Sequence, residues 1–494
     1  MEHVLRQCVI ALRLAERTGL DDDARLAVYY TALLDNVGCH TDAHEQAKWF
    51  GDDIALKADK YRYELRGVRG AAAGMRRIGS GSPPLHRFRL GLEFVLKGYR
   101  DVDGMIERHA ALAEELARLI GLPAAVQRAL GASYEMWDGK GWPGKLAGTE
   151  IPIGARVVQL AEFMEVAHRV SGVEGARKLA RSRSGKQFDP ELAASFCAGA
   201  GEILGDLDTI ATWTMVVDNE PSLGIHLSDD QFDQALDAIA AFVDLKSPYF
   251  LGHSQAVAEL VAEAGATMGL AGEDLRTLRR AGLAHGFGRL GISNSIWDKP
   301  GPLGAGERER VRLHPYLNER MMQQAPALAS LAALTAQFRE RSDGSGYPRR
   351  LAGGAIPIAA RVLAAADVYQ AMREPRPHRP QRDAEEAAAE LRRDAAAGRL
   401  DGDAVDAVLK AAGQPVAQRR DRPAGLTARE VEVLRLVSRG LSSKEIANTL
   451  VISPKTARNH IEHIYTKIGA SSRVNASLFA MQHGLLAADA FHES

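Results

Sequence analysis

The feature that most constrains the fold of this chain is an internal repeat. The segment WDGKGWPGKLAGTEIPIGARV, which begins at Trp137, returns 205 positions later as SDGSGYPRRLAGGAIPIAARV, which begins at Ser342. The pattern that follows His3 returns 250 positions later after His253. Self-similarity of this kind indicates that two copies of one fold lie in tandem. The two offsets differ because the first copy carries 45 additional residues, which fall after Gly38.

Both copies are expected to be helical. Alanine-rich patterns with helical spacing dominate residues 1–412, and β-branched runs are short and scarce. We therefore predict an all-α body. The N-terminal segment is an amphipathic helix rather than a signal peptide, and no window is apolar enough to span a bilayer. Three widely separated cysteines indicate a reducing compartment. We expect a cytoplasmic protein with no membrane partner.

The C-terminal segment, residues 426–490, carries the start and stop signals of four short helices. In chain order these signals are a capping box of Thr427 and Glu430, a helix-ending Gly440, a cap at Ser442 or Ser443, the pair Ser453-Pro454, and a last helix from Arg473 to His483. A helix, a short helix, a tight turn and a capped helix form an arrangement that fits the major groove of DNA. This segment closely resembles the LuxR-type helix-turn-helix, and the match runs through all four helices.

The third of these helices is expected to contact double-stranded DNA. Its apolar residues fall on one face, and its cationic and amide side chains fall elsewhere. The side chains predicted to face the groove or its phosphates are Lys455, Thr456, Arg458, Asn459, His463 and Lys467. We expect Arg458 and Asn459 to read bases. The formal net charge of the chain is only −1, so DNA affinity must come from a local patch, to which Arg419, Arg420 and Arg422 would add.

The two copies resemble the HD-GYP branch of the HD phosphohydrolases. In the second copy the motifs, in order, are DLKSPYFLGHS, GLAHGFGRLGI, LHP, RSDGSGYP and AADVYQAM. The resemblance implies an all-α domain whose active members bind two or three metal ions and hydrolyse cyclic di-GMP or a related phosphodiester. Such metals would generate a hydroxide and neutralise the charge that develops on the phosphate.

The second copy departs from the family pattern at its metal ligands. Gly286 stands where the family has the bridging aspartate after His285, and Arg289 stands in place of a lysine. Phe338 and Arg339 replace an adjacent pair of histidines. A two-metal mechanism is therefore not expected in this copy.

The first copy departs further from the pattern. Its replacements are Asp35-Asn36 for the His-Asp pair, Cys39 for the lysine, Ser133-Tyr134 for the histidine pair, and Glu162 for the final aspartate. Only His3 and His109 remain, and without a ligand cluster we interpret them as structural histidines. The lone Cys39 is interpreted as a buried filler.

The ligands that remain in the second copy allow two interpretations. His253, His285 and Asp367 could hold a single divalent ion, and His314 also remains at its position. We favour instead that no cofactor binds and that these are relic residues hydrogen-bonded in a helical core, because loss of the bridging carboxylate removes both charge and geometry. Arg339 places a cation where a ligand stood, which opposes a metal and favours an anion such as a phosphate.

These features predict four segments. They are a first degenerate HD-GYP-like domain (1–228), a second (229–412), a linker (413–425) and the helix-turn-helix domain (426–490). The leading hypothesis is a homodimeric transcriptional regulator, whose body senses a nucleotide or another small-molecule effector or provides an assembly surface. One alternative is a metal-dependent phosphodiesterase coupled to DNA binding, and another is a purely structural dimerisation module.

Overall fold

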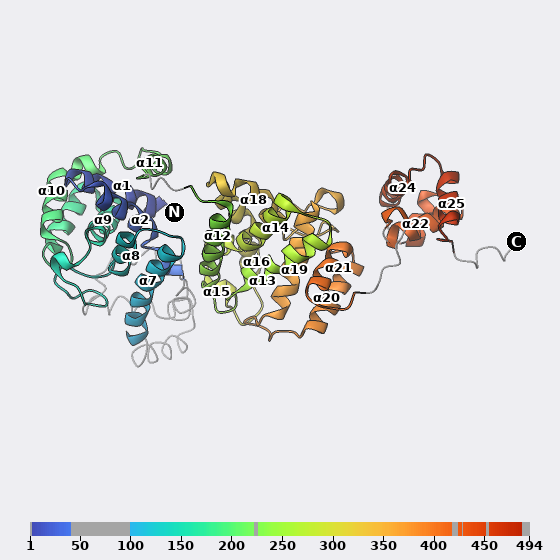
Figure 1. Ribbon diagram of the computed structural model, residues 1–494, viewed down its shortest axis with the longest axis horizontal. Coiled ribbons are helices and arrows are strands. Elements are labelled where there is room, and N and C mark those ends of the chain that lie inside the picture. Colours follow the sequence, from blue (N-terminus) through green and yellow to red (C-terminus); the bar gives the residue numbers. More distant parts are fainter. Residues whose placement is uncertain are drawn as a thin grey trace. The chain divides into compact units, whose positions relative to one another are not determined.

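The computed structural model describes residues 2–40, 99–221, 226–416, 423–426, 428–450 and 454–486. Several sequence predictions lie outside this set: most of the region after Gly38 that carries the insertion (residues 41–98), the side chain of Cys39, the caps Thr427 and Ser453, and the arginines Arg419, Arg420 and Arg422. The described residues form helices and no strands, which confirms the predicted all-α class (Figure 1). None of the described helices is both long and apolar enough to cross a membrane.

The first copy is built from seven α-helices within the described residues. They are α1 (Glu2–Arg17), α2 (Asp22–Leu34), α7 (Tyr99–Leu119), α8 (Ala124–Gly131), α9 (Ile153–Arg183), α10 (Pro190–Leu204) and α11 (Thr212–Asp218). The buried faces of α1, α2, α9, α10 and α11 form one apolar core. The long helix α9 is kinked at Gly172, whose φ of 67° is not helical.

The second copy repeats this pattern with its own core. Its helices are α12 (Asp229–Asp244), α13 (His253–Thr267), α14 (Gly272–Ala284), α15 (Asn294–Trp297), α16 (Ala305–Arg312), α17 (His314–Met322), α18 (Pro326–Gln337), α19 (Ile358–Arg373), α20 (Ala384–Ala396) and α21 (Gly402–Ala411). Apolar side chains of α12, α13, α14, α17 and α18 are buried together. Ser228 starts α12 with a capping box. The Ser228 hydroxyl accepts from the backbone N–H of Gln231, and the Gln231 side chain accepts from the backbone N–H of Ser228.

The glycine-proline segments have the same structural role in both copies. Each contains a cis peptide bond, at Trp142-Pro143 and at Tyr347-Pro348. Beneath each turn lies a buried glutamate whose carboxylate accepts backbone N–H bonds from the turn. Glu135 accepts from Gly144, Lys145 and Leu146, and Glu340 accepts from Arg349 and Leu351.

The glycines before these prolines are needed for close backbone approach. A Cβ on Gly141 would lie 2.3 Å from the backbone nitrogen of Met136, and a Cβ on Gly346 would lie 2.3 Å from that of Arg341. Because neither backbone can yield, only glycine fits at these positions. The turns therefore contribute to the shape of the domain.

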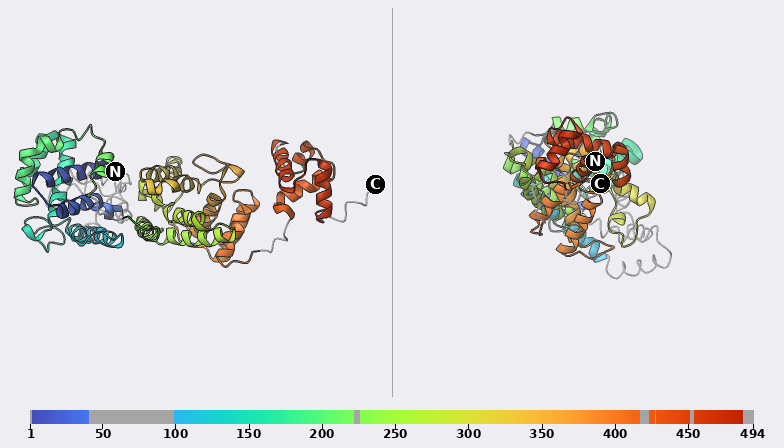
Figure 2. Two further views of the ribbon diagram at one scale, coloured as in Figure 1. Left: turned by 45° about the horizontal axis from the view of Figure 1, so that its top comes forward. Right: turned by 90° about the vertical axis from the view of Figure 1, so that its right-hand side faces the viewer.

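The C-terminal unit, Pro415–Ser494, is separate from the unit Met1–Gln414. Its helices are α22 (Ala428–Ser438), α23 (Ser443–Leu450), α24 (Pro454–Ile468) and α25 (Arg473–Gln482), a compact group in both views of Figure 2. These bounds agree with the predicted four helices to within a residue or two. Ser442 forms a capping box with Glu445, and the hydroxyl of Ser472 accepts from the N–H of Asn475.

Candidate functional site

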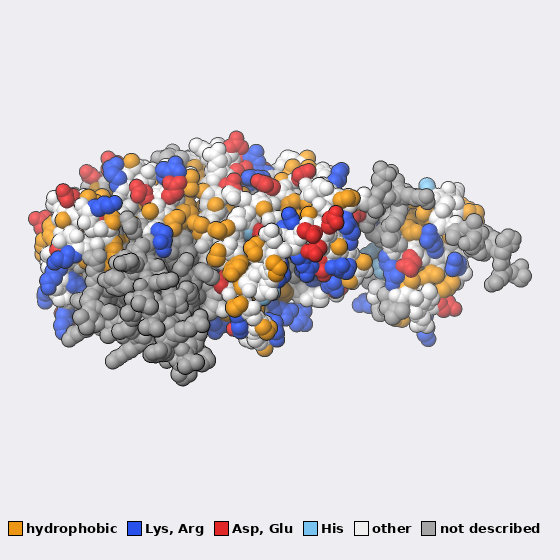
Figure 3. Space-filling model, turned by 90° about the horizontal axis from the view of Figure 1, so that it is seen from below, with side chains coloured by type: hydrophobic (Ala, Val, Ile, Leu, Met, Phe, Trp, Pro, Cys, Tyr) orange, Lys and Arg blue, Asp and Glu red, His pale blue; other side chains and the backbone are white. Residues whose placement is uncertain are grey.

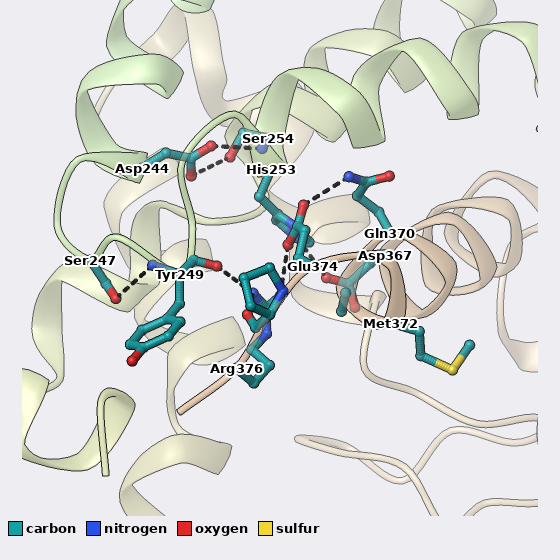
Figure 4. Close-up of polar contacts among 12 residues, drawn as sticks. Asp244, Ser247, Tyr249, His253, Ser254, Asp367, Gln370, Met372, Glu374 and Arg376 are labelled. Carbon is teal, nitrogen blue, oxygen red and sulfur yellow. Dashed lines mark hydrogen bonds and ion pairs between the residues drawn. The ribbon is translucent and has the colours of Figure 1, made fainter. Parts of the chain in front are cut away.

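Three potential metal ligands meet in the second copy. His253 is the first residue of α13, and Asp367 lies in the middle of α19 (Figure 4). His285 is the C-cap of α14. One ligand atom from each lies within 4.8 Å of the others, and all three side chains are fully buried. His253 Nε2 lies 3.3 Å from Asp367 Oδ1 and 3.4 Å from His285 Nε2. The structure thus brings together the three residues that the sequence analysis selected.

The two histidines of this cluster, and the neighbouring His314, are oriented as metal-binding histidines usually are. Each ring directs Nδ1 outward to an acceptor: His253 to Glu374 at 2.8 Å, His285 to the Gly282 carbonyl at 2.6 Å, and His314 to the Val311 carbonyl at 2.5 Å. Such partners fix the tautomer and leave Nε2 facing inward. Burial lowers the pKa of His285 to about 4, so this ring is neutral at neutral pH.

Aromatic packing separates His314 from the other ligands. Phe338 is fully buried, and its ring makes edge contacts with His285 at 5.1 Å and with His314 at 5.4 Å between centroids. A phenyl ring offers no electron pair to a metal. The position that the family pattern gives to a second metal ligand is therefore filled by a hydrocarbon.

A guanidinium group lies against two of the three ligands, His285 and Asp367. Arg289 is 3% exposed, and its NH2 group donates to His285 Nε2 at 3.1 Å. The same group lies 3.8 Å from Asp367 Oδ1, and NH1 lies 3.6 Å from Asp244 Oδ1. The face of Phe250 covers the guanidinium, whose carbon lies 4.6 Å from the ring centroid.

A second guanidinium neutralises Asp367 from another side. Arg339 NH2 lies 3.0 Å from Asp367 Oδ2. Burial by itself would raise the pKa of Asp367, but the positive charge of Arg339 and the hydrogen bond with His253 outweigh it and hold the pKa well below its usual range. The carboxylate is therefore ionised and is already paired with cations of the chain itself.

The side chains of this site can be compared with the metal centre that the family pattern implies. They do not fit a two-metal centre, because Gly286 supplies no bridge and Phe338 supplies no ligand. The spacing of His253, His285 and Asp367 suits a single ion. Such an ion would need the lone pair of His285 Nε2, which the NH2 group of Arg289 now occupies.

The outer face of α24 is the second candidate site. Lys455, Thr456, Arg458, Asn459 and His463 are all exposed, as the prediction of a groove-facing surface requires. Ala457 and Ile464 are buried in the apolar core of this domain. Lys467 is placed differently, because its ammonium lies 2.8 Å from Glu430 Oε2 and 3.3 Å from the Gly425 carbonyl oxygen.

Comparison with known protein families places both parts of the chain. The HD domain family matches residues 100–192 and 237–404, which together make up more than half of the chain. The chain belongs to the HD domain family. Residues 424–480 match the luxR family of bacterial regulatory proteins, so the chain combines an HD-type body with a LuxR-type helix-turn-helix domain.

Relatives of the HD-type body are cyclic dinucleotide phosphodiesterases. The 3'3'-cGAMP-specific phosphodiesterase 3 of Vibrio cholerae is 28% identical over 385 residues, which cover 76% of this chain and 83% of the relative. A cyclic di-GMP phosphodiesterase response regulator of Xanthomonas campestris is 36% identical over 168 residues, 33% of this chain and 43% of the relative. A solved structure of a cyclic GMP-AMP specific phosphodiesterase from Vibrio cholerae has a TM-score of 0.55 at 24% identity and covers 84% of this chain and 93% of that one. That likeness confirms the fold.

The histidines of the first HD copy have different partners from those of the second. His3 Nδ1 lies 2.5 Å from Glu165 Oε2, and the same carboxylate is paired with Arg6 at 3.1 Å. His109 is buried, with its ring centroid 6.3 Å from that of Tyr134. Among the described residues, three or more metal-ligand side chains come together in the second HD copy and not in the first.

Two residues of the second HD copy have no role assigned to them in the sequence analysis, although Asp244 begins one of its motifs. Glu374 orients His253 and is itself paired with Arg376 at 2.9 Å, immediately after α19 (Figure 4). Asp244 holds the start of α13 by accepting from the Ser254 N–H at 2.7 Å, and it also pairs with Arg289. The charged run EPRPHR after α19 was a visible signal, but nothing in the sequence says which element it covers.

Proposed function

We propose that this protein is a DNA-binding transcriptional regulator whose HD-type body senses a ligand or supports assembly and performs no hydrolysis. The observation that carries the proposal is the exposed face of α24 with its cationic and amide side chains. The opposite face of α24 packs into the apolar core of the domain. Lysine and arginine at such positions attract phosphates, and arginine and asparagine read bases. A role on chromosomal DNA implies the cytoplasm.

Local placement of the charge supports this proposal. On the face drawn in Figure 3, basic and acidic side chains of the described residues are interspersed, in keeping with the formal net charge of −1. A nearly neutral molecule gains DNA affinity from a local cationic face rather than from its overall field. The simplest test is binding of the full chain to a random duplex at low salt, where a protein with this function must bind measurably.

The alternative function is hydrolysis of a cyclic dinucleotide, which is the activity given in the names of the relatives. The composition of the site argues against hydrolysis, because a phosphodiesterase must activate water with metal ions or an equivalent base. In the second HD copy the guanidinium of Arg289 contacts a metal-ligand residue, His285. Phe338 and Arg339 stand at two positions where the family pattern has metal-binding histidines. Phosphate recognition by Arg339 remains a proposal, and an anion would have to compete with Asp367 for this guanidinium.

We expect no turnover of cyclic di-GMP or 3'3'-cGAMP above the metal-only background. The measurement is product formation by the purified full chain with manganese and, separately, with ferrous iron under anaerobic conditions. His253→Ala is the matched variant, because it removes one ligand of the cluster. Turnover by the wild type that disappears in this variant would contradict the proposal and establish the enzyme.

A homodimer is also part of the proposal, and α25 offers a surface for it. Val474, Leu478 and Met481 are 75%, 53% and 60% exposed and recur at the spacing that places them on one face of the helix. An exposed apolar row of this kind commonly marks a protein–protein contact. A single helix-turn-helix module buries too little surface for high affinity, so pairing would supply the second half-site contact. We further propose that the HD-type body adds contacts to this dimer.

Replacing Val474, Leu478 and Met481 together by glutamine is expected to shift the protein from dimer toward monomer. The reason is that glutamine keeps helix propensity but removes the apolar surface that association would bury. Light scattering of the full chain, free and on DNA, measures the state. Asn475→Gln is the control, since this exposed residue lies on α25 outside the apolar row. A wild type that is monomeric both free and on DNA would contradict the dimer.

A further inference from the structure

We infer that Arg289 is the resident cation of the second HD copy and takes the place that a metal ion holds in this type of site. Its NH2 group lies 3.1 Å from His285 Nε2 and 3.8 Å from Asp367 Oδ1, two of the three potential ligands. The inference goes beyond the proposed function and does not depend on DNA binding.

Gly286 is what makes room for this guanidinium. A Cβ at position 286 would lie 3.1 Å from Arg289 NH1, 3.3 Å from the guanidinium carbon and 3.3 Å from Ser254 Oγ. Contacts this short require the neighbour to shift by a few tenths of an ångström. A side chain at position 286 and the observed placement of Arg289 are therefore in competition. The small residue at 286 and the guanidinium at 289 are therefore sterically compatible in this site.

The carboxylates of the site are paired with cations of the chain itself. Each of three carboxylates has a guanidinium partner. The pairs are Asp367 with Arg339 at 3.0 Å, Asp244 with Arg289 at 3.6 Å, and Glu374 with Arg376 at 2.9 Å. A divalent ion added to this set would leave two uncompensated positive charges in a buried environment, which is strongly unfavourable. It would also meet the guanidinium of Arg289 directly.

The same geometry predicts a latent metal site. His253, His285 and Asp367 are already gathered, and the two histidines are oriented by Glu374 and the Gly282 carbonyl. Removal of the guanidinium would free the lone pair of His285 Nε2. Two imidazoles and one carboxylate then form a donor set suited to zinc or cobalt.

The test compares zinc binding by the full chain with and without the guanidinium. Arg289→Met keeps most of the side-chain volume and removes the charge, so we expect it to gain one zinc equivalent at least about ten-fold tighter than the wild type, the size of effect that neighbouring groups exert on metal sites. Calorimetry measures affinity, and cobalt absorption reports coordination by the ligands. His285→Ala in the Arg289→Met background should remove the gain.

Two further variants keep the inference testable if Arg289→Met folds poorly. Gly286→Ala adds the methyl group that competes with the guanidinium, and it should raise zinc affinity in the same direction. Arg339→Met also removes a cation paired with Asp367 but leaves Arg289 on His285, so it should gain little. Zinc binding to wild type as tight as to Arg289→Met, and abolished by His285→Ala, would overturn the inference. Failure of Arg289→Met and Gly286→Ala alike to gain zinc would do the same.

Discussion

Replacing Asp367 by asparagine is expected to destabilise the second HD domain by about 3–5 kcal/mol, the usual loss when one partner of a buried ion pair is removed. Asp367 is fully buried and lies 3.0 Å from Arg339 and 3.8 Å from Arg289. Asparagine preserves the shape but leaves two guanidinium groups without this compensating charge. Chemical denaturation of the full chain, followed by circular dichroism, should show the transition of this domain at much lower denaturant concentration.

A matched change at an exposed ion pair provides the control for Asp367→Asn. Asp230 is paired with Arg276 at 3.9 Å, and its side chain is 84% exposed. Asp230→Asn should cost less than about 1 kcal/mol, because solvent screens such pairs. Adding Arg339→Met to Asp367→Asn should recover part of the loss, since it removes one unpaired charge. An effect of Asp367→Asn no larger than that of Asp230→Asn would show that these buried charges do not stabilise the domain.

Much of the helical architecture is predictable because its signals are local. The start of α23 follows from Ser442 and Glu445, and the end of α22 follows from a glycine, Gly440, at a φ of 89°. Such signals involve residues three or four apart, so the sequence displays them directly. The two HD copies could be matched for a similar reason, since each turn with a cis proline repeats a short, contiguous motif.

The candidate site could be predicted only in part, because its decisive contacts join distant segments. The sequence shows that Gly286 and Arg289 differ from the family pattern, and it shows each difference separately. Only the structure shows that Gly286 leaves space for the guanidinium of Arg289. It also shows that this guanidinium lies close to Asp367, 78 positions later in the chain. The prediction of a relic core therefore rests only on the loss of metal ligands. The structure adds that cations of the chain itself now neutralise the site.

Substitution of Arg458 should have the largest effect on specific DNA recognition. Arg458 is exposed on α24 beside Asn459, where a major-groove reader would lie. Arg458→Lys keeps the positive charge but cannot form the bidentate pair with guanine. We therefore expect affinity for a duplex selected from a random-sequence pool to fall about 10- to 100-fold, which corresponds to the 1–3 kcal/mol of one base contact. Affinity for an unselected duplex should stay nearly unchanged.

Lys455→Ala should produce the opposite pattern, because Lys455 lies on the exposed first turn of α24 and is expected to contact a phosphate. Affinity for selected and unselected duplexes should fall together, and the slope of log affinity against log salt should decrease by about one contact. Lys410→Ala, at an exposed lysine of α21 in the HD-type body, is the control for loss of one charge and should change neither quantity. If Arg458→Lys and Lys455→Ala behaved like Lys410→Ala at every salt concentration, α24 would not be the DNA-reading helix, and the central proposal would be lost.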